Sequence, residues 1–274
     1  MKLIIRYTLI VAISFAFINV LVAQDAAGKK KKKKSKKAEI ELPSVSQELL
    51  DSLAANFVWV TGGKFMMGDY AGEADEKPAY EVVVDGFAIS KYPVTQRQWT
   101  AIMSSSPSEF KGCDQCPIDM VSWDDAQHFI AILNKLTGKN YALPTEAEWE
   151  YAAKGGLKSQ GLRYSGADNI EAVGWYTGNS GRHPHPVGEK TPNELGLYDM
   201  TGNVWEWCRD WYNKNYYELR ESNNPTGPAS GAARVRRGGS WFTQEVSCRT
   251  SSRNSVKQDY KDDSGGFRLV QYPN

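Results

Sequence analysis

Four cysteines are the residues of this chain best suited to redox or metal chemistry. Cys113 and Cys116 are separated by two residues in a loop after a Ser/Pro-rich stretch. As half of a zinc site, this pair lacks a second pair at suitable spacing. It also lacks the surroundings of a thioredoxin-like redox motif. We therefore predict a local disulfide between Cys113 and Cys116.

Cys208 and Cys248 each lie next to a block that mixes aromatic residues, glycines and charges; the blocks are 201–207, 236–241 and 265–270. Such a mixture suits irregular backbone held by large side chains, with glycine where a Cβ would not fit. Four cysteines allow three connectivities. Because an even number favours pairing in an exported protein, we predict that Cys208 and Cys248 cross-link these loops.

Few other residues of the sequence could bind a metal ion, act in catalysis or bind a glycan. His183 and His185 offer two imidazoles, but zinc needs a third ligand and only His128 remains, within a helical pattern. The chain has no Gly-x-Ser-x-Gly elbow, phosphate loop or His-Glu-x-x-His motif. Most tryptophans are expected in the core. The aromatic residues best placed to bind a glycan are Trp211, Tyr212, Tyr216 and Tyr217.

The elements that position these residues change character along the chain. Apolar runs predict strands at 57–60, 64–68, 81–85 and 87–90. Helices are predicted after the capping residues Thr95, Ser122 and Thr145. No helical period survives beyond Gly155, where short strands are expected at 234–237 and 267–270. We predict one α+β domain that is rich in irregular loops.

The N-terminal residues resemble an export signal. Lys2 and Arg6 precede an apolar run that ends near Ala23, so we expect a signal peptide over residues 1–23. The alternative, a permanent anchor, is disfavoured because the run is short for a bilayer span. After cleavage we expect no transmembrane span. Residues 24–50 are predicted to form a flexible linker, followed by the domain at 51–274.

The linker carries eight lysines in the nine positions from Lys29 to Lys37. These side chains repel one another and suit a solvated tether; the alternative is adhesion to an anionic surface of the cell envelope. The whole chain has a formal charge of +1, but from Ala38 onward 23 basic residues face 31 acidic ones. An acidic domain argues against nucleic-acid binding.

The motifs, in their order, resemble those of the formylglycine-generating enzyme family, also called sulfatase-modifying factors. The matching segments are 63–68, 92–95, 117–123, 143–153, 196–207, 237–241 and 266–268. The resemblance extends from about residue 55 to 272 and implies a C-type-lectin-like mixed fold. It also implies an oxidase that uses oxygen and copper to convert a sulfatase cysteine to formylglycine.

The family holds copper between two cysteines that are separated by four residues, shortly after Gly-Gly-Ser. Counting forward from the glycines places Cys248 at the first position and Arg253 at the second. Counting back from the arginines places the two positions at Glu245 and Thr250. Under either count the pair is incomplete. One thiol cannot form a two-sulfur Cu(I) site, so copper is not expected.

The resemblance implies further binding positions. A calcium site would use the Glu206 carboxylate with backbone oxygens of Asp199, Gly202 and Val204; the alternative is that Glu206 forms a salt bridge with an arginine. Ligand-binding positions map to Trp205, Arg249, Arg253, Ser264 and Arg268, and Ser264 replaces the family's substrate-binding asparagine.

These observations favour an exported, non-catalytic member of the family that binds a protein partner or assists assembly in the cell envelope. Relatives of the fold serve as structural parts of envelope secretion and gliding machinery. Two alternatives stay open. One is an oxidase that acts on a protein cysteine with Cys248 alone, and the other is a glycan-binding domain.

Overall fold

The four longer helices among the described residues begin at capping residues. The computed structural model describes residues 42–273, and its longer helices are α1 (Gln47–Ala55), α2 (Gln96–Met103), α3 (Trp123–Thr137) and α4 (Glu146–Ala153). Thr95, Ser122 and Thr145 each cap a helix through a reciprocal capping box. The three predicted helices are therefore confirmed.

Helix α1 is absent from the sequence prediction. The Ser46 side chain accepts a hydrogen bond from the Leu49 amide, and Leu49 and Leu53 are buried. The domain boundary expected at residue 51 thus falls inside α1. The predicted signal peptide and the lysines at 29–37 lie outside the described residues. Between residues 42 and 273, none of the helices has the length and apolar character needed to cross a bilayer.

Two antiparallel sheets are built from the first half of the chain and its C-terminus. One has the order β1-β4-β10-β5, formed by β1 (Phe57–Val60), β4 (Phe87–Ser90), β10 (Val270–Tyr272) and β5 (Asn140–Ala142). The other pairs β2 (Gly63–Met67) with β3 (Tyr80–Val84). The C-terminal strand therefore lies between segments that are far away in the sequence.

A third sheet joins the three aromatic-glycine blocks. Its order is β8-β7-β6-β9, formed by β8 (Arg253–Val256), β7 (Arg234–Arg237), β6 (Trp205–Trp211) and β9 (Gly265–Gly266). Strand β7 matches the prediction. The expectation of irregular backbone through 201–207 was wrong from Trp205 onward, because β7 and β9 pair with β6 on its two sides. The strand predicted at 267–270 was wrong for residues 267–269, which lie between β9 and β10, and only Val270 belongs to a strand.

Most of the remaining structure is loop with single helical turns. These turns are α5 (Ile170–Val173), η1 (Ala74–Glu76), η2 (Gly156–Lys158), η3 (Tyr216–Leu219) and η4 (Glu245–Cys248). The domain therefore combines short regular elements with long connecting segments, as the α+β prediction requires.

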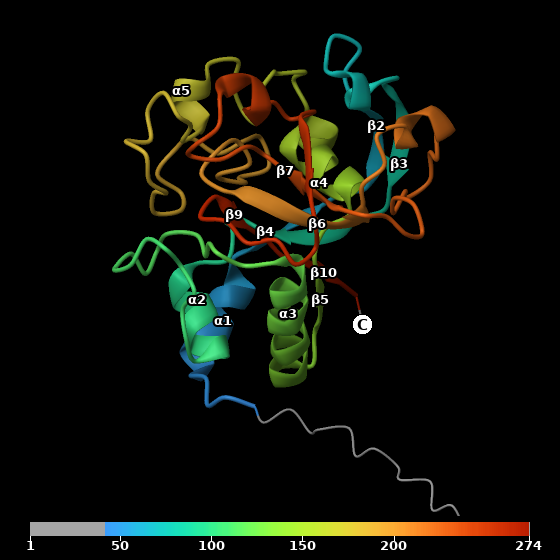
Figure 1. Cartoon of the computed structure of the whole chain (residues 1–274). Helices are drawn as coiled ribbons and strands as arrows, with labels where there is room; N and C mark the ends of the chain where they lie inside the picture. The colour runs from blue at the N-terminus through green and yellow to red at the C-terminus, as the bar shows by residue number, and fades with distance from the viewer. Residues whose placement is uncertain (1–41, 274) are drawn as a thin grey trace, which may run out of the picture. The chain divides into compact units, whose positions relative to one another are not determined.

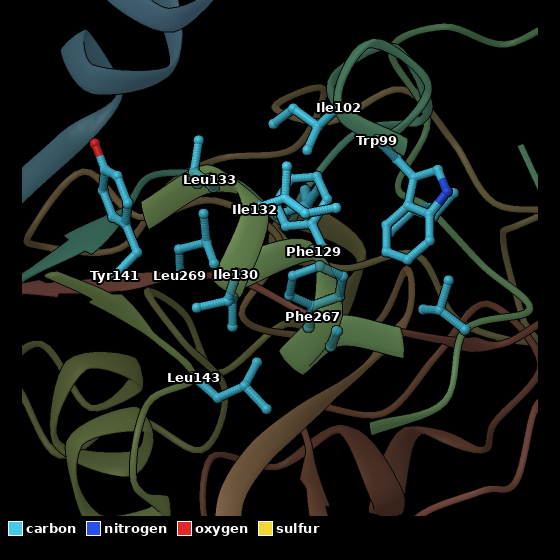
Figure 2. Close-up of a cluster of buried hydrophobic side chains, with 14 of the residues drawn as sticks. Trp99, Ile102, Phe129, Ile130, Ile132, Leu133, Tyr141, Leu143, Phe267 and Leu269 are labelled. Atoms are coloured by element: carbon cyan, nitrogen blue, oxygen red, sulfur yellow. The ribbon is translucent and has the colours of Figure 1, made fainter. Parts of the chain in front are cut away.

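The core lies on both faces of the β1-β4-β10-β5 sheet. Figure 1 places α1, α2 and α3 on one side of this sheet and α4 on the other. Alternate strand residues point to opposite faces of a sheet. Phe57 therefore packs with a first hydrophobic cluster, built around Phe129 and Leu133 of α3, and Val58 packs with a second cluster, built around Trp149 of α4. Figure 2 shows the first cluster, in which Trp99 stacks on Phe129 with ring centroids 5.3 Å apart.

Candidate functional site

Cys248 is enclosed by its own loop. It lies at the end of η4 with no exposed surface, and its Sγ is 3.5 Å from the hydroxyl of Thr243. Gly239 has a φ of +79°, and a Cβ there would come within 2.4 Å of the sulfur. Glycine at this position therefore leaves room for the thiol.

Thr243 and Cys248 are separated by four residues, the spacing that the resemblance implies for the copper-binding cysteines. Both counts from the sequence missed Thr243, because they started from the glycines or from the arginines. A count back from Cys248 that leaves four residues between the two positions would have found it. The structure thus gives Cys248 a hydroxyl as its neighbour at the spacing that the resemblance implies for a second sulfur.

The other positions suggested by those counts lie elsewhere. Arg253 pairs with Glu146 on α4. Thr250 is buried, and its carbonyl accepts a hydrogen bond from Arg237. Glu245 is exposed on η4. None of the three has a hydrogen bond to the Cys248 sulfur within residues 42–273, so Thr243 replaces them as the residue facing the thiol.

The Cys248 thiol is poorly suited to act as a nucleophile. Burial raises its pKa to about 11, and the hydrogen bond from Thr243 only partly offsets that effect. The thiolate is the reactive form of cysteine. At neutral pH this sulfur is therefore protonated and inert.

The structure confirms one predicted disulfide and corrects the other. Cys113 and Cys116 are bonded, with sulfur atoms 2.06 Å apart. Cys208 and Cys248 are both free and buried, so the predicted cross-link was wrong. Cys208 packs under α4, whereas Cys248 packs against Tyr164, Ile170 and Val173 in a separate cluster. Proximity to aromatic-glycine blocks in the sequence did not bring the two sulfurs together.

An arginine–carboxylate layer lies beneath α4. The Arg237 side chain is fully buried, pairs with Glu150 and donates to backbone carbonyls of the 250–252 segment. Arg253 forms a two-point pair with Glu146, with N–O distances of 2.7 and 2.8 Å. Two-point pairs of this kind fix geometry strongly. The layer ties α4 to β7, to the segment after Cys248 and to β8.

Arg249 joins the layer from the adjacent loop. It makes a two-point pair with Glu76, with distances of 2.8 and 2.6 Å. Burial alone raises the pKa of Glu76, but the Arg249 hydrogen bonds and charge hold it below its usual value. Two expected binding positions, Arg249 and Arg253, are thus engaged in internal pairs.

The carboxylate expected to bind calcium, that of Glu206, is also internally satisfied. Glu206 accepts hydrogen bonds from Arg268 at 2.6 and 2.8 Å and from Trp149 Nε1 at 2.6 Å. The Asp199 carboxylate accepts from the Gly188 amide at 2.8 Å. A cation beside Glu206 would lie against the Arg268 guanidinium, so this carboxylate does not fit a calcium site. The geometry matches the salt-bridge alternative.

The remaining expected positions are less exposed than a ligand site requires. Trp205 is buried, and its backbone amide donates to the Ser264 carbonyl at 2.7 Å. Tyr216 and Tyr217 are buried, so these two are not a surface for a glycan. Across residues 42–273, no cluster of three or more His, Cys, Asp or Glu side chains is placed to hold a metal ion.

Comparison with known proteins decides the family. Residues 44–273 match the model of the sulfatase-modifying factor enzyme 1-like domain, FGE-sulfatase. The chain belongs to this family. The resemblance found in the sequence is confirmed, and so is the C-type-lectin-like α+β fold with many loops.

Known relatives of this FGE-sulfatase chain differ in length. The formylglycine-generating enzyme of Streptomyces coelicolor is 40% identical over 180 residues, which cover 60% of this chain and 55% of that protein. Serine/threonine-protein kinase pkn1 of Chlamydia caviae is 32% identical over 248 residues. The match covers 80% of this chain but only 38% of the length of that protein. Treponema denticola variable protein 1 superimposes with a TM-score of 0.73 at 28% identity, over 79% of this chain and 95% of that one.

Proposed function

We propose that this FGE-sulfatase chain is a non-catalytic, exported member of its family that binds a protein partner in the cell envelope. The observation that carries the proposal is the pair formed by Thr243 and Cys248. A hydroxyl and one buried thiol do not supply the two soft sulfur ligands that favour Cu(I). The raised pKa of Cys248 further disfavours a thiolate.

The binding role is supported by the rigid framework of the domain. The arginine–carboxylate layer and the three sheets hold long surface loops in defined positions, and loops on a rigid framework are a common basis for recognition. The apolar N-terminal run and the lysines at 29–37 support export and contact with an anionic envelope surface.

Copper binding tests the proposal directly. The mature chain is titrated with Cu(I) against a chelating competitor, beside the variant Thr243→Cys, which adds the second sulfur at four-residue spacing. We expect no stoichiometric Cu(I) binding by the wild type and one tightly held ion in the variant. Failure of the variant to bind would contradict the geometry assigned to residues 243 and 248.

A second assay addresses the oxidase alternative, which the free Cys248 thiol keeps open. The wild type is incubated with Cu(I), oxygen and a cysteine peptide of the sulfatase type, and aldehyde formation is followed by mass spectrometry. We expect no product. Turnover that disappears in Cys248→Ser would replace the proposal with a single-thiol oxidase.

A further inference from the structure

A surface groove lies beside the segment that follows Cys248. Its larger part is a cavity of about 600 Å³ between β2, the 154–168 segment and residues 249–251. A second cavity of about 380 Å³ lies between the 69–73 loop and Val246. The two cavities share Asp69, Arg163 and Arg249, so they adjoin at these residues, and together the two cavities are called the groove.

Arg163 is the cation in this groove that lacks an opposite charge. Lys64 pairs with Glu81 at 2.9 Å and Lys154 with Glu150 at 2.6 Å. Arg249 is held by Glu76. By contrast, no carboxylate of the described part of the chain forms an ion pair with the Arg163 guanidinium, which packs 5.4 Å from the Tyr164 ring.

The backbone around Arg163 is fixed although its side chain is exposed. The Arg163 amide donates to Asp168 Oδ1 at 2.8 Å, and the Arg163 carbonyl accepts from the Thr250 amide at 3.2 Å. The other acidic groups along the groove are Asp69, which lies 3.5 Å from Arg249, and Glu73. The guanidinium is therefore presented from an anchored loop.

Apolar side chains occur on both sides of Arg163. Met66 lines the larger cavity and is 44% exposed, while Phe65 and Leu162 are partly buried beside it. Val246 lines the smaller cavity and is also 44% exposed. A free anion would use Arg163 alone and leave these apolar surfaces in water, whereas an extended chain would cover them.

We propose that this groove binds an extended segment of a protein partner, with an acidic side chain on Arg163 and apolar side chains on either side. The acidic residue lies within the segment, not at its end, because one of the two cavities lies on each side of Arg163. A carboxylate forms strong two-point hydrogen bonds with a guanidinium. The inference rests on the proposed partner-binding function and names the chemistry of the partner.

The test uses a blocked pentapeptide, acetyl-Leu-Phe-Glu-Leu-Val-amide, and its Glu→Gln counterpart, titrated calorimetrically into the mature chain. We expect the acidic peptide to bind at least about tenfold more tightly than the amide version, as a charged hydrogen-bonded pair requires. Arg163→Gln is expected to abolish that difference. Lys158→Gln, at an exposed position outside the groove, serves as the matched control and is expected to preserve it.

Three outcomes would overturn the inference. The first is that the acidic peptide fails to bind at millimolar concentration. The second is that Arg163→Gln leaves the affinity for the acidic peptide unchanged. The third is that a digalacturonate binds at Arg163 while the peptide does not. Circular dichroism confirms that the variants are folded. Copper binding or turnover by the wild type would reject the non-catalytic proposal independently of these titrations, so the two failures are distinguishable.

Discussion

The arginine–carboxylate layer beneath α4 and the loops around Cys248 differ in the partners of their buried polar groups. In the layer, Glu146 and Glu150 are matched by Arg253 and Arg237. In the loop region, the Cys248 sulfur contacts only uncharged groups, the Thr243 hydroxyl and the Gln244 carbonyl. One buried carboxylate oxygen of Asp119 has no hydrogen-bond partner among the described residues. Phe110 and Trp241, with ring centroids 5.3 Å apart, join the 104–119 loop to the Cys248 loop.

This difference in partners distinguishes the residues that hold the framework of the family from the residues that would carry its chemistry. Paired charges connect α4, β7 and β8, and the loss of one partner would leave a buried charge. Replacement of a sulfur by a hydroxyl, as we propose at residue 243, leaves no such charge, so the framework tolerates it. Under this proposal, one position removes the copper site while the fold is kept.

The largest expected effect comes from breaking the layer. Glu150→Gln removes the carboxylate that pairs with Arg237 and Lys154, so Arg237 keeps only its longer 3.7 Å pair with Glu146. It also weakens the hydrogen bond that Gly68 donates to Glu150. We expect the free energy of unfolding to fall by about 3–5 kcal/mol, the range for removing one partner of a buried pair. Urea denaturation measures it.

The matched control for that prediction is Glu81→Gln, which removes the carboxylate of the exposed Lys64–Glu81 pair. A change of less than about 1 kcal/mol is expected there. Equal losses in both variants would mean that the layer is no more important to stability than a surface pair, and the contrast between the two regions would disappear.

The next effect is a pH dependence from Asp119. Burial raises the pKa of this carboxyl to about 6, whereas the unfolded chain ionises near 3.8. The folded state therefore keeps a proton that the unfolded state loses, so stability falls as pH rises from about 4 to about 6. The shift corresponds to roughly 3 kcal/mol.

Asp119→Asn should remove this dependence, because an amide remains neutral throughout. The measurement is the difference in unfolding free energy between wild type and variant at pH 4 and pH 7, with the exposed Asp51→Asn as control. A difference that does not change between pH 4 and pH 7 would show that folding does not shift the pKa of Asp119, which would contradict the prediction.

The smallest effect is expected at Thr243. Thr243→Val removes the hydroxyl next to Cys248 and its hydrogen bonds with Ser240, with a stability loss of about 1 kcal/mol. The pKa of the Cys248 thiol should rise further, because the Thr243 hydrogen bond lowers it. Alkylation rates against pH, measured in a Cys208→Ser background, report the change. An unchanged profile would mean that the hydroxyl does not contact the sulfur.

Local patterns were sufficient to predict much of the fold. The capping residues Thr95, Ser122 and Thr145 start helices as expected, since caps act within one turn. The β7 strand and the Cys113–Cys116 disulfide were also predictable, because strand propensity and a two-residue spacing are local properties. Helix α1 was missed because its amphipathic pattern rests on only two buried leucines.

By itself, the sequence determined the family, the capped helices and the absence of a complete cysteine pair, all of which depend on residue identity and short spacing. Only the tertiary structure decided that Cys208 and Cys248 stay apart and that Glu206 binds Arg268. These relations join positions that are brought together by sheet pairing and burial. Because each charged or polar group finds its partner through packing, spacing along the chain could not specify them.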